Sequence, residues 1–304
     1  MNKYLKEMLL AGFCLLMAAV GSGQNKILVF QSDFGLKDGA VSAMKGVAMG
    51  VSPELKLFDL THEIPAYNIW EAAYRLEQTV PYWPAGTVFV SVVDPGVGTS
   101  RRSVVLKTNS GQFIVSPDNG TLTLVAASQG IAGIREIDEA VNRRKDSKRS
   151  YTFHGRDVYA FTGARLAAGV ISFEAVGPAL PNQVLSIPYQ KATLEDKKLR
   201  GAIAILDIQY GNIWTNIPAD LVNQLNPAFG DRLHVILYHR GAKAYEGDMP
   251  YSETFGAVAK GKPLAYLNSL LQLSFALNQG SFASQYHIGS GNEWSVEVSS
   301  SSKK

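Results

Sequence analysis

The sequence predicts an α/β domain with a mainly parallel sheet, followed by a smaller β-rich domain. From residue 26 to about residue 169, short runs rich in Val, Ile and Phe alternate with helical patterns. This alternation is typical of parallel strands covered by helices. From Gly201 onward strand-like runs dominate, at residues 202–208, 233–238, 273–277 and 294–298. A chain of 304 residues is long enough for two such domains.

The first domain opens with strands and helices in alternation. We expect strands at residues 27–31, 55–60 and 88–93, and helices at residues 41–49 and 70–80. Acidic residues follow each of these strands, namely Asp33, Asp59 and Asp94. In such sheets the ligand lies beyond the carboxyl ends of the strands. We therefore expect the three carboxylates to line one crevice.

Antiparallel and helical elements follow these strands. Residues 103–107 and 112–115, separated by Thr-Asn-Ser-Gly, predict a hairpin. Helices are expected at residues 122–128 and 157–168, and in the second domain at residues 219–225. The domain boundaries that follow from these patterns are residues 24–186 for the first domain, 187–200 for a linker that includes a charged stretch, 201–298 for the second domain and 299–304 for a disordered tail.

The first 23 residues predict a signal peptide. Lys3 and Lys6 precede an apolar run at residues 8–20, which small residues follow. The run is shorter than the ~20 residues of a membrane-spanning helix, so we expect no integral span once the leader is removed. If the segment is a signal peptide, we expect export to the periplasm or the exterior. If it is not, we expect the protein in the cytoplasm. Removal takes away Cys14, the single cysteine of the sequence, and excludes thiol chemistry in the mature chain.

Charge along the chain gives little sign of a charged partner. The formal net charge is +3, and the basic residues concentrate only at residues 143–149. Most such runs are solvated loops, so we expect no nucleic-acid partner. The histidines are His62, His154, His234, His239 and His287, and none forms a His-x-x-x-His pair. A metal hydrolase is therefore a weak alternative, and no metal ligand is predicted.

Two loops carry the chemistry of the first domain. Residues 93–102 bring Asp94 into a glycine-rich turn that ends in Arg101 and Arg102, and residues 152–157 add His154. An acid, a guanidinium and an imidazole that titrates near neutral pH are the ingredients of a reaction centre. On residues alone, two other roles stay open: Asp94 bonds backbone amides of its turn, and His154 bonds a loop carbonyl.

With these loops, the chain resembles the S-adenosylmethionine (SAM) hydrolases, also called SAM hydroxide adenosyltransferases, which are related to the fluorinase and chlorinase. The resemblance covers nearly all of the mature chain. The motifs that carry it, in order, are residues 32–35 with Asp38, 59–64, 93–99, 116–120, 152–157, 207–216, 268–269 and 278–280.

The resemblance implies a Rossmann-like amino-terminal domain, a β-barrel-like carboxy-terminal domain and a homotrimer with the substrate at the subunit interface. It also implies hydrolysis of SAM to adenosine and methionine without a cofactor. The catalytic triad of this family falls on Asp94, Arg101 and His154. Halogenases of the family carry an aromatic residue in place of this aspartate, so Asp94 favours water over halide.

The substrate-binding residues are implied in the same way. Asp33 binds the ribose hydroxyls, and Tyr67 covers the ribose or the sulfonium. The remaining implied contacts are Asp38, Asp207 and Ser269 to the methionine end, Tyr210, Asn212 and Trp214 to adenine, and Gly155 and Asn278 around them. Leu270 and Leu271 stand where family members often have Gly and Arg, which leaves the methionine carboxylate without a guanidinium partner. The alternatives are a halide-dependent adenosyltransferase and a non-catalytic, exported SAM- or nucleoside-binding protein.

Overall fold

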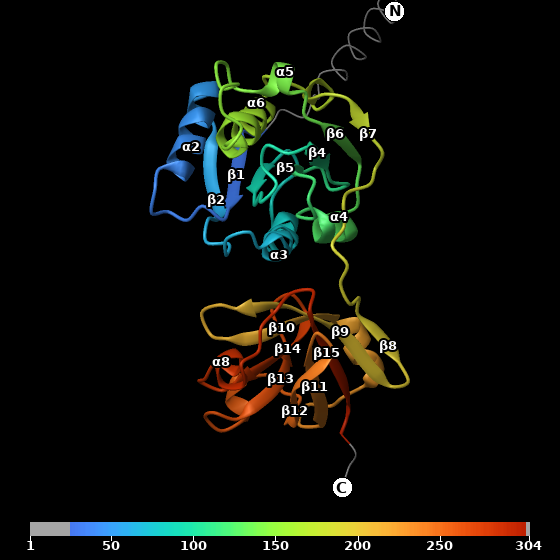
Figure 1. Cartoon of the computed structure of the whole chain (residues 1–304). Helices are drawn as coiled ribbons and strands as arrows, with labels where there is room; N and C mark the ends of the chain where they lie inside the picture. The colour runs from blue at the N-terminus through green and yellow to red at the C-terminus, as the bar shows by residue number, and fades with distance from the viewer. Residues whose placement is uncertain (1–24, 302–304) are drawn as a thin grey trace, which may run out of the picture. The chain divides into compact units, whose positions relative to one another are not determined.

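A computed structural model describes residues 25–301 of the chain. The expected signal peptide at residues 1–23 and residues 302–304 of the expected tail lie outside the described residues. The chain divides after Leu185 into two compact units (Figure 1). No helix within residues 25–301 has both the length and the apolar character needed to cross a membrane.

The first unit is built on a mixed β-sheet with the strand order β2-β1-β3-β5-β4-β6-β7. The bounds are β1 Ile27–Ser32, β2 Lys56–Thr61, β3 Val88–Val92, β4 Ser103–Lys107, β5 Phe113–Pro117, β6 Gly133–Glu136 and β7 Ala179–Leu180. Strands β2, β1, β3 and β5 pair in parallel, whereas β4, β6 and β7 join by antiparallel pairing. The prediction of a mainly parallel sheet is thus correct for one half of the sheet only. The antiparallel β4–β5 hairpin is confirmed, and the Rossmann-like topology stays a prediction.

Helices cover both faces of this sheet (Figure 1). One face carries α2 (Ala40–Val51), the π-helical turn η2 (Gly155–Ala160) and α6 (Phe161–Ala167). The other carries α3 (Ile69–Thr79) and α4 (Thr123–Gln129). Shorter elements are η1 (Val80–Tyr82), α5 (Glu139–Asn142) and η3 (Glu174–Val176).

Strand alternation divides the core of the first unit into two layers. Adjacent residues of β1 show this, since Val29 packs in the cluster beneath α3 and α4, and Phe30 packs with α2 and α6. Successive side chains of a strand point to opposite faces, so a strand covered on both sides is apolar throughout. The continuous apolar runs in β1 and β3 follow from this burial, and both strands lie where the sequence predicts them.

The second unit is an antiparallel, barrel-like sheet in the order β12-β11-β15-β9-β10-β14-β13, with β8 paired to β9. The bounds are β8 Thr193–Glu195, β9 Lys198–Asp207, β10 Asn212–Pro218, β11 Arg232–His239, β12 Ala242–Pro250, β13 Pro263–Leu267, β14 Gln272–Leu277 and β15 Trp294–Ser300, with helices α7 Ala219–Leu225 and α8 Phe282–Tyr286 and the turn η4 Phe255–Ala257. The two end strands approach each other where Tyr251 bridges to Ala265 and the Ser252 amide donates to the Ala265 carbonyl at 2.8 Å. The sheet is therefore nearly closed.

The boundaries of the second unit differ from the expected ones at both ends. Much of the charged stretch expected as linker forms the β8–β9 hairpin, which turns through Asp196 and Lys197 at φ +52° and +60°. Two left-handed residues are the conformation that a tight hairpin turn requires. At the other end, β15 continues through Ser299 and Ser300, so the described part of the expected tail is mostly strand.

Candidate active site

The candidate site lies at the carboxyl ends of β1 and β3. The chain passes from β1 to β2 on one side and then to β3 on the other side of β1, so β1 and β3 flank a topological switch point. Ligands bind at such points in open α/β sheets. A cavity of about 250 Å³ lies here, lined by Asp33, Phe34, Ala66, Tyr67, Val92, Asp94, Val97, Thr152, Phe153, His154 and Gly155.

The loop after β3 folds back so that Arg101 faces Asp94. Two turns shorten the path, with the Val97 amide donating to the Asp94 carbonyl at 3.2 Å and the Thr99 amide donating to the Gly96 carbonyl at 3.1 Å. The Arg101 Nε donates to the Asp94 Oδ1 at 2.8 Å, and the second nitrogen of the fork donates to Oδ2. The Arg101 side chain is 11% exposed and the Asp94 side chain is 4% exposed, so this is a bidentate and largely buried ion pair.

Burial alone would lower the pKa of Arg101, but the hydrogen bonds to Asp94, together with the charges of Tyr159, Asp94 and Glu139, outweigh burial and raise that pKa above its ordinary value. The guanidinium is therefore a permanent cation beside the cavity. A carboxylate that accepts both bonds from a permanent cation is a fixed hydrogen-bond acceptor. This geometry suits Asp94 to orient a polar molecule in the cavity.

His154 completes the arrangement from the loop before η2. Its Nδ1 lies 3.2 Å from an Arg101 terminal nitrogen, and the ring is almost fully buried. Burial lowers the pKa of His154, and the nearby cations Arg101 and Arg143 lower it further against the opposing effect of Glu139 and Asp94. The imidazole is thus neutral at neutral pH. The structure brings together Asp94, Arg101 and His154, which the sequence analysis singled out.

Tyr159 and Ser103 support the ion pair, and sequence analysis missed both. Arg101 donates to the Ser103 Oγ at 2.9 Å, Ser103 and the Tyr159 hydroxyl lie 3.1 Å apart, and that hydroxyl donates to the Asp94 Oδ2 at 3.5 Å. Burial raises the pKa of Tyr159 far above its ordinary value, so the hydroxyl keeps its proton. One indication for Tyr159 was present in the sequence, because it lies one helical turn after Gly155, which belongs to the catalytic motif at residues 152–157.

Asp33, Tyr67 and Gly155 also line the cavity. The Asp33 Oδ2 accepts the Tyr67 backbone N–H at 2.9 Å and so anchors the Tyr67 loop, where the φ of Tyr67 is +68°. The Tyr67 side chain is 72% exposed at the cavity edge. Phe34 and Phe153 form an edge-to-face pair with ring centroids 5.8 Å apart. A Cβ on Gly155 would lie 3.2–3.3 Å from these two rings, so any larger residue there would push the rings of the cavity wall apart.

Asp38 lies away from this wall. It is exposed, and its Oδ1 accepts the Ala40 amide at 2.8 Å at the start of α2. Short polar side chains commonly satisfy the first amides of a helix in this way. A capping role accounts for this residue in the isolated unit, and the expected contact to the methionine end stays a prediction.

Asp59 does not join the crevice, which corrects the expectation of three converging acids. The Asp59 Oδ2 accepts from Lys45 at 2.6 Å, and Oδ1 lies 3.1 Å from the His62 Nε2. The Nδ1 of His62 lies 2.7 Å from the Ser32 Oγ. This order resembles a nucleophilic triad, but Ser32 is fully buried and its hydroxyl accepts the Phe34 amide at 3.3 Å. These contacts connect the end of β1, at Ser32, to the end of β2, at Asp59 and His62.

In the second unit, several of the expected binding residues gather at one end of the sheet. Asp207 ends β9 and pairs in register with Asn212 at the start of β10, whose amide donates to the Asp207 Oδ2 at 3.1 Å. Trp214 lies two residues further along the same strand, in register with Ser274. Tyr210, in the intervening turn, is 68% exposed. This end therefore offers an amide, a carboxylate and accessible aromatic surface.

Ser269 lies apart from that group. It is exposed in the turn between β13 and β14, whereas Asp207 lies near the other end of β14, across β10. At about 3.4 Å per strand residue, roughly 20 Å separates the two ends. Asn278 follows β14 directly, and its amide donates to the Val258 carbonyl at 2.7 Å, which fixes a loop. One small ligand group therefore cannot contact both Ser269 and Asp207 of one chain.

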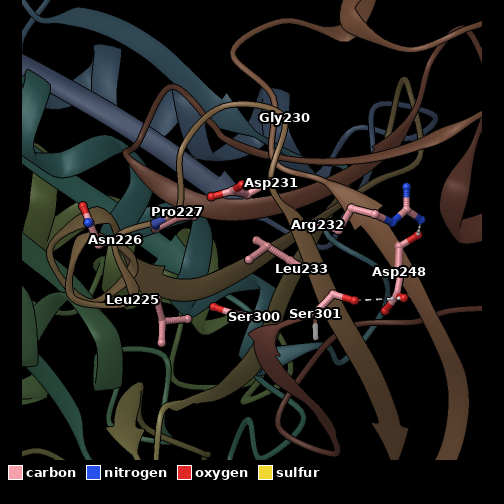
Figure 2. Close-up of a pocket in the computed structure, with 10 residues that line it drawn as sticks. All are labelled: Leu225, Asn226, Pro227, Gly230, Asp231, Arg232, Leu233, Asp248, Ser300 and Ser301. Atoms are coloured by element: carbon pink, nitrogen blue, oxygen red, sulfur yellow. Dashed lines mark hydrogen bonds between the residues drawn. The ribbon is translucent and has the colours of Figure 1, made fainter. Parts of the chain in front are cut away.

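A larger hollow of about 650 Å³ lies elsewhere on the second unit (Figure 2). Two of its polar side chains bind Asp248: the Ser301 Oγ donates to the Asp248 Oδ2 at 3.1 Å, and Arg232 donates to the Asp248 backbone carbonyl at 2.7 Å. It contains neither a histidine nor any residue expected at the site. Among residues 25–301, no group of three or more His, Cys, Asp or Glu side chains is placed to hold a metal ion.

Comparison with known families agrees with the site geometry. The family model for the SAM hydroxide adenosyltransferase N-terminal domain matches residues 28–177, and that for the C-terminal domain matches residues 201–295. The chain belongs to the SAM hydroxide adenosyltransferase family. Both matched segments include predicted site residues, so the family assignment covers the cavity of the first unit and the strand end of the second.

Relatives within the SAM hydroxide adenosyltransferase family include hydrolases and halogenases. An (R)-S-adenosyl-L-methionine hydrolase from Salinispora tropica is 34% identical over 88% of this chain and 96% of the relative. A fluorinase from Actinopolyspora mzabensis is 29% identical over 87% of this chain and 95% of the relative. The crystal structure of an uncharacterized conserved protein from Thermotoga maritima is 35% identical, with a TM-score of 0.81, and covers 90% of this chain and 99% of that one.

Proposed function

We propose that this protein hydrolyses SAM to adenosine and methionine. The observation that carries the proposal is the buried Asp94–Arg101 pair with neutral His154 on the wall of a cavity at the β1–β3 switch point. The relatives named as hydrolases, which match most of the chain, support it.

The reaction depends more on the position of the attacking water than on acid catalysis. The oxygen of water attacks the 5′ carbon of the ribose, the carbon–sulfur bond breaks, and its electron pair stays on sulfur. Methionine leaves as a neutral thioether, and water gives up one proton. Because the leaving group needs no proton, the site has to hold water in line with the breaking bond, which can lower the barrier by ~7–11 kcal/mol.

The three central residues divide this work. Asp94, whose oxygens are fixed by Arg101, orients the water and accepts its hydrogen bond. The Arg101 cation stabilises the hydroxide character that develops on the oxygen. His154, which is neutral at neutral pH, takes up the proton that water loses and then passes it outward; burial and the neighbouring cations lower the pKa of the ring, and this favours the second step.

Substrate binding extends beyond the cavity of the first unit. Its volume of about 250 Å³ is below the ~300–1,000 Å³ of typical ligand sites, so it holds only part of SAM. We assign the ribose hydroxyls to Asp33 and the sulfonium to the aromatic edge at Tyr67. The rest of the substrate would contact a neighbouring subunit in the expected homotrimer, through the binding residues predicted in the second unit. Asp38 is assigned to the methionine amino group.

The test is a product analysis with purified protein, SAM and excess chloride. Chromatography follows adenosine, methionine and 5′-chloroadenosine, with Asp94→Ala as the inactive control and light scattering for the subunit number. Adenosine and methionine that disappear in the control support hydrolysis. Chlorinated product would assign the protein to the halogenase branch, and SAM binding without turnover would make it a receptor.

The halogenase alternative has its basis in the fluorinase relatives. The oxygens of Asp94 can accept a hydrogen bond from water, whereas a halide has no hydrogen to donate to them, so the cavity favours water. Export is also part of the proposal and rests on the sequence of residues 1–23 alone. Fractionation of cells with amino-terminal sequencing of the mature protein tests it.

A further inference from the structure

His154 faces a cation at each ring nitrogen. The Arg101 terminal nitrogen lies 3.2 Å from Nδ1, and the Arg143 terminal nitrogen lies 3.4 Å from Nε2. A guanidinium only donates hydrogen bonds. A neutral imidazole has one lone pair and can accept from one arginine, whereas an imidazolium would direct two N–H groups at two cations. The geometry therefore disfavours the charged ring from both sides.

Arg143 is held in this position by several partners. Its side chain is 2% exposed, and it donates to the Ser147 Oγ at 3.2 Å and to the Glu139 Oε2 at 2.5 Å. It also donates to the Ser150 carbonyl at 2.8 Å, and its guanidinium lies 4.8 Å from the Tyr151 ring centroid. The prediction of a solvated basic run is wrong at this residue. Such a set of contacts fixes a side chain rather than leaving it in solvent.

We propose that Arg143 is a positioning residue that holds His154 in its neutral, proton-accepting form. The charged groups that face His154 are Asp94, Arg101, Arg143 and Glu139. Asp94 is already neutralised by Arg101, so Arg143 and Glu139 set the balance at the outer side of the ring. Arg143 acts through His154 and is not among the residues that line the cavity at the carboxyl ends of β1 and β3.

The opposite charges of Arg143 and Glu139 allow a test by the direction in which the pKa of His154 shifts. Replacing Arg143 by Met removes a cation and leaves Glu139 facing the ring, so the pKa of His154 rises by about one unit or more. Replacing Glu139 by Gln removes the anion that raises the pKa of His154 most, so this pKa falls. Arg143→Lys keeps the charge and should stay close to the unaltered protein. Arg149→Met is the matched control, because Arg149 is an exposed arginine of the same loop.

The measurement is an NMR titration of the His154 ring proton, assigned with a His154→Asn variant, in the full protein. It needs no turnover, so it stands even if the proposed hydrolysis fails. The inference rests on that hydrolysis only for a second readout, in which the acid limb of kcat/KM moves in the same directions. Opposite shifts in Arg143→Met and Glu139→Gln, with none in Arg149→Met, support the proposal. Shifts of the same sign, or no shift, overturn it, and if Arg143→Met does not fold, Glu139→Gln and Arg143→Lys decide.

Discussion

The Asp94–Arg101 pair should be worth far more than a surface ion pair. Both side chains are nearly buried, and two hydrogen bonds join them. Removing one partner leaves an uncompensated buried charge, which costs about 3–5 kcal/mol. We therefore expect Asp94→Ala and Arg101→Met each to lower the free energy of unfolding by that amount, and the double variant to lose about 3 kcal/mol less than the sum of the two.

The assay is urea unfolding at neutral pH followed by tryptophan fluorescence. Replacing Trp214 and Trp294 by Phe leaves Trp70 and Trp83 as reporters of the first unit. The matched control is the same cycle on Lys26 and Glu54, an ion pair of the first unit whose side chains are 43% and 67% exposed, and whose coupling should be at most ~1 kcal/mol. If the two cycles give the same coupling, the argument from burial fails.

Further predictions concern the cavity wall, the buried histidines and Tyr159. Gly155→Ala places a methyl group 3.2–3.3 Å from two aromatic rings, so KM for SAM should rise about tenfold and the free energy of unfolding should fall by about 1–3 kcal/mol; an unaltered KM contradicts the assignment of this wall. The pKa values of His62 and His154 are lowered by burial, so the folded protein binds fewer protons than the unfolded chain below pH ~6.5. The free energy of unfolding should thus fall as the pH drops from ~6.5 toward the folded-state pKa values, less steeply in His62→Asn; equal slopes would contradict this. Tyr159→Phe removes a donor to Asp94 and should lower kcat about tenfold at every pH between ~6 and ~9, because the raised pKa keeps the hydroxyl protonated; a new pH dependence would refute a purely donating role.

The parts of the fold that sequence could predict are those in which burial dictates the residue pattern. β1 and β3 are covered on both faces and are therefore apolar runs that end in Asp33 and Asp94. β6 is four residues long with two charged residues, and β7 has only two residues, so these two antiparallel strands left no comparable pattern. In the β8–β9 hairpin the charges sit on an exposed strand face, where Lys198 and Arg200 pair with Glu297, and this composition resembles a linker.

The site could be predicted residue by residue but not as a network. The motifs identified Asp94, Arg101 and His154, which indeed meet. Arg143 was assigned to a solvated run because the basic residues around it are exposed; the one signal that set it apart was Glu139 four residues earlier, at the spacing of a helical ion pair. Sequence spacing cannot show that a buried arginine faces the outer nitrogen of His154, because that contact depends on how η2 packs against the sheet.

The most direct test of the central claim is turnover of SAM in water enriched in oxygen-18, with mass spectrometry of both products. If water held at Asp94 attacks the ribose, the adenosine carries the heavy oxygen on its 5′ hydroxyl and the methionine carries none. Adenosine without the label, or label in the methionine, would mean that the bond breaks in another way and would contradict the role assigned to this site.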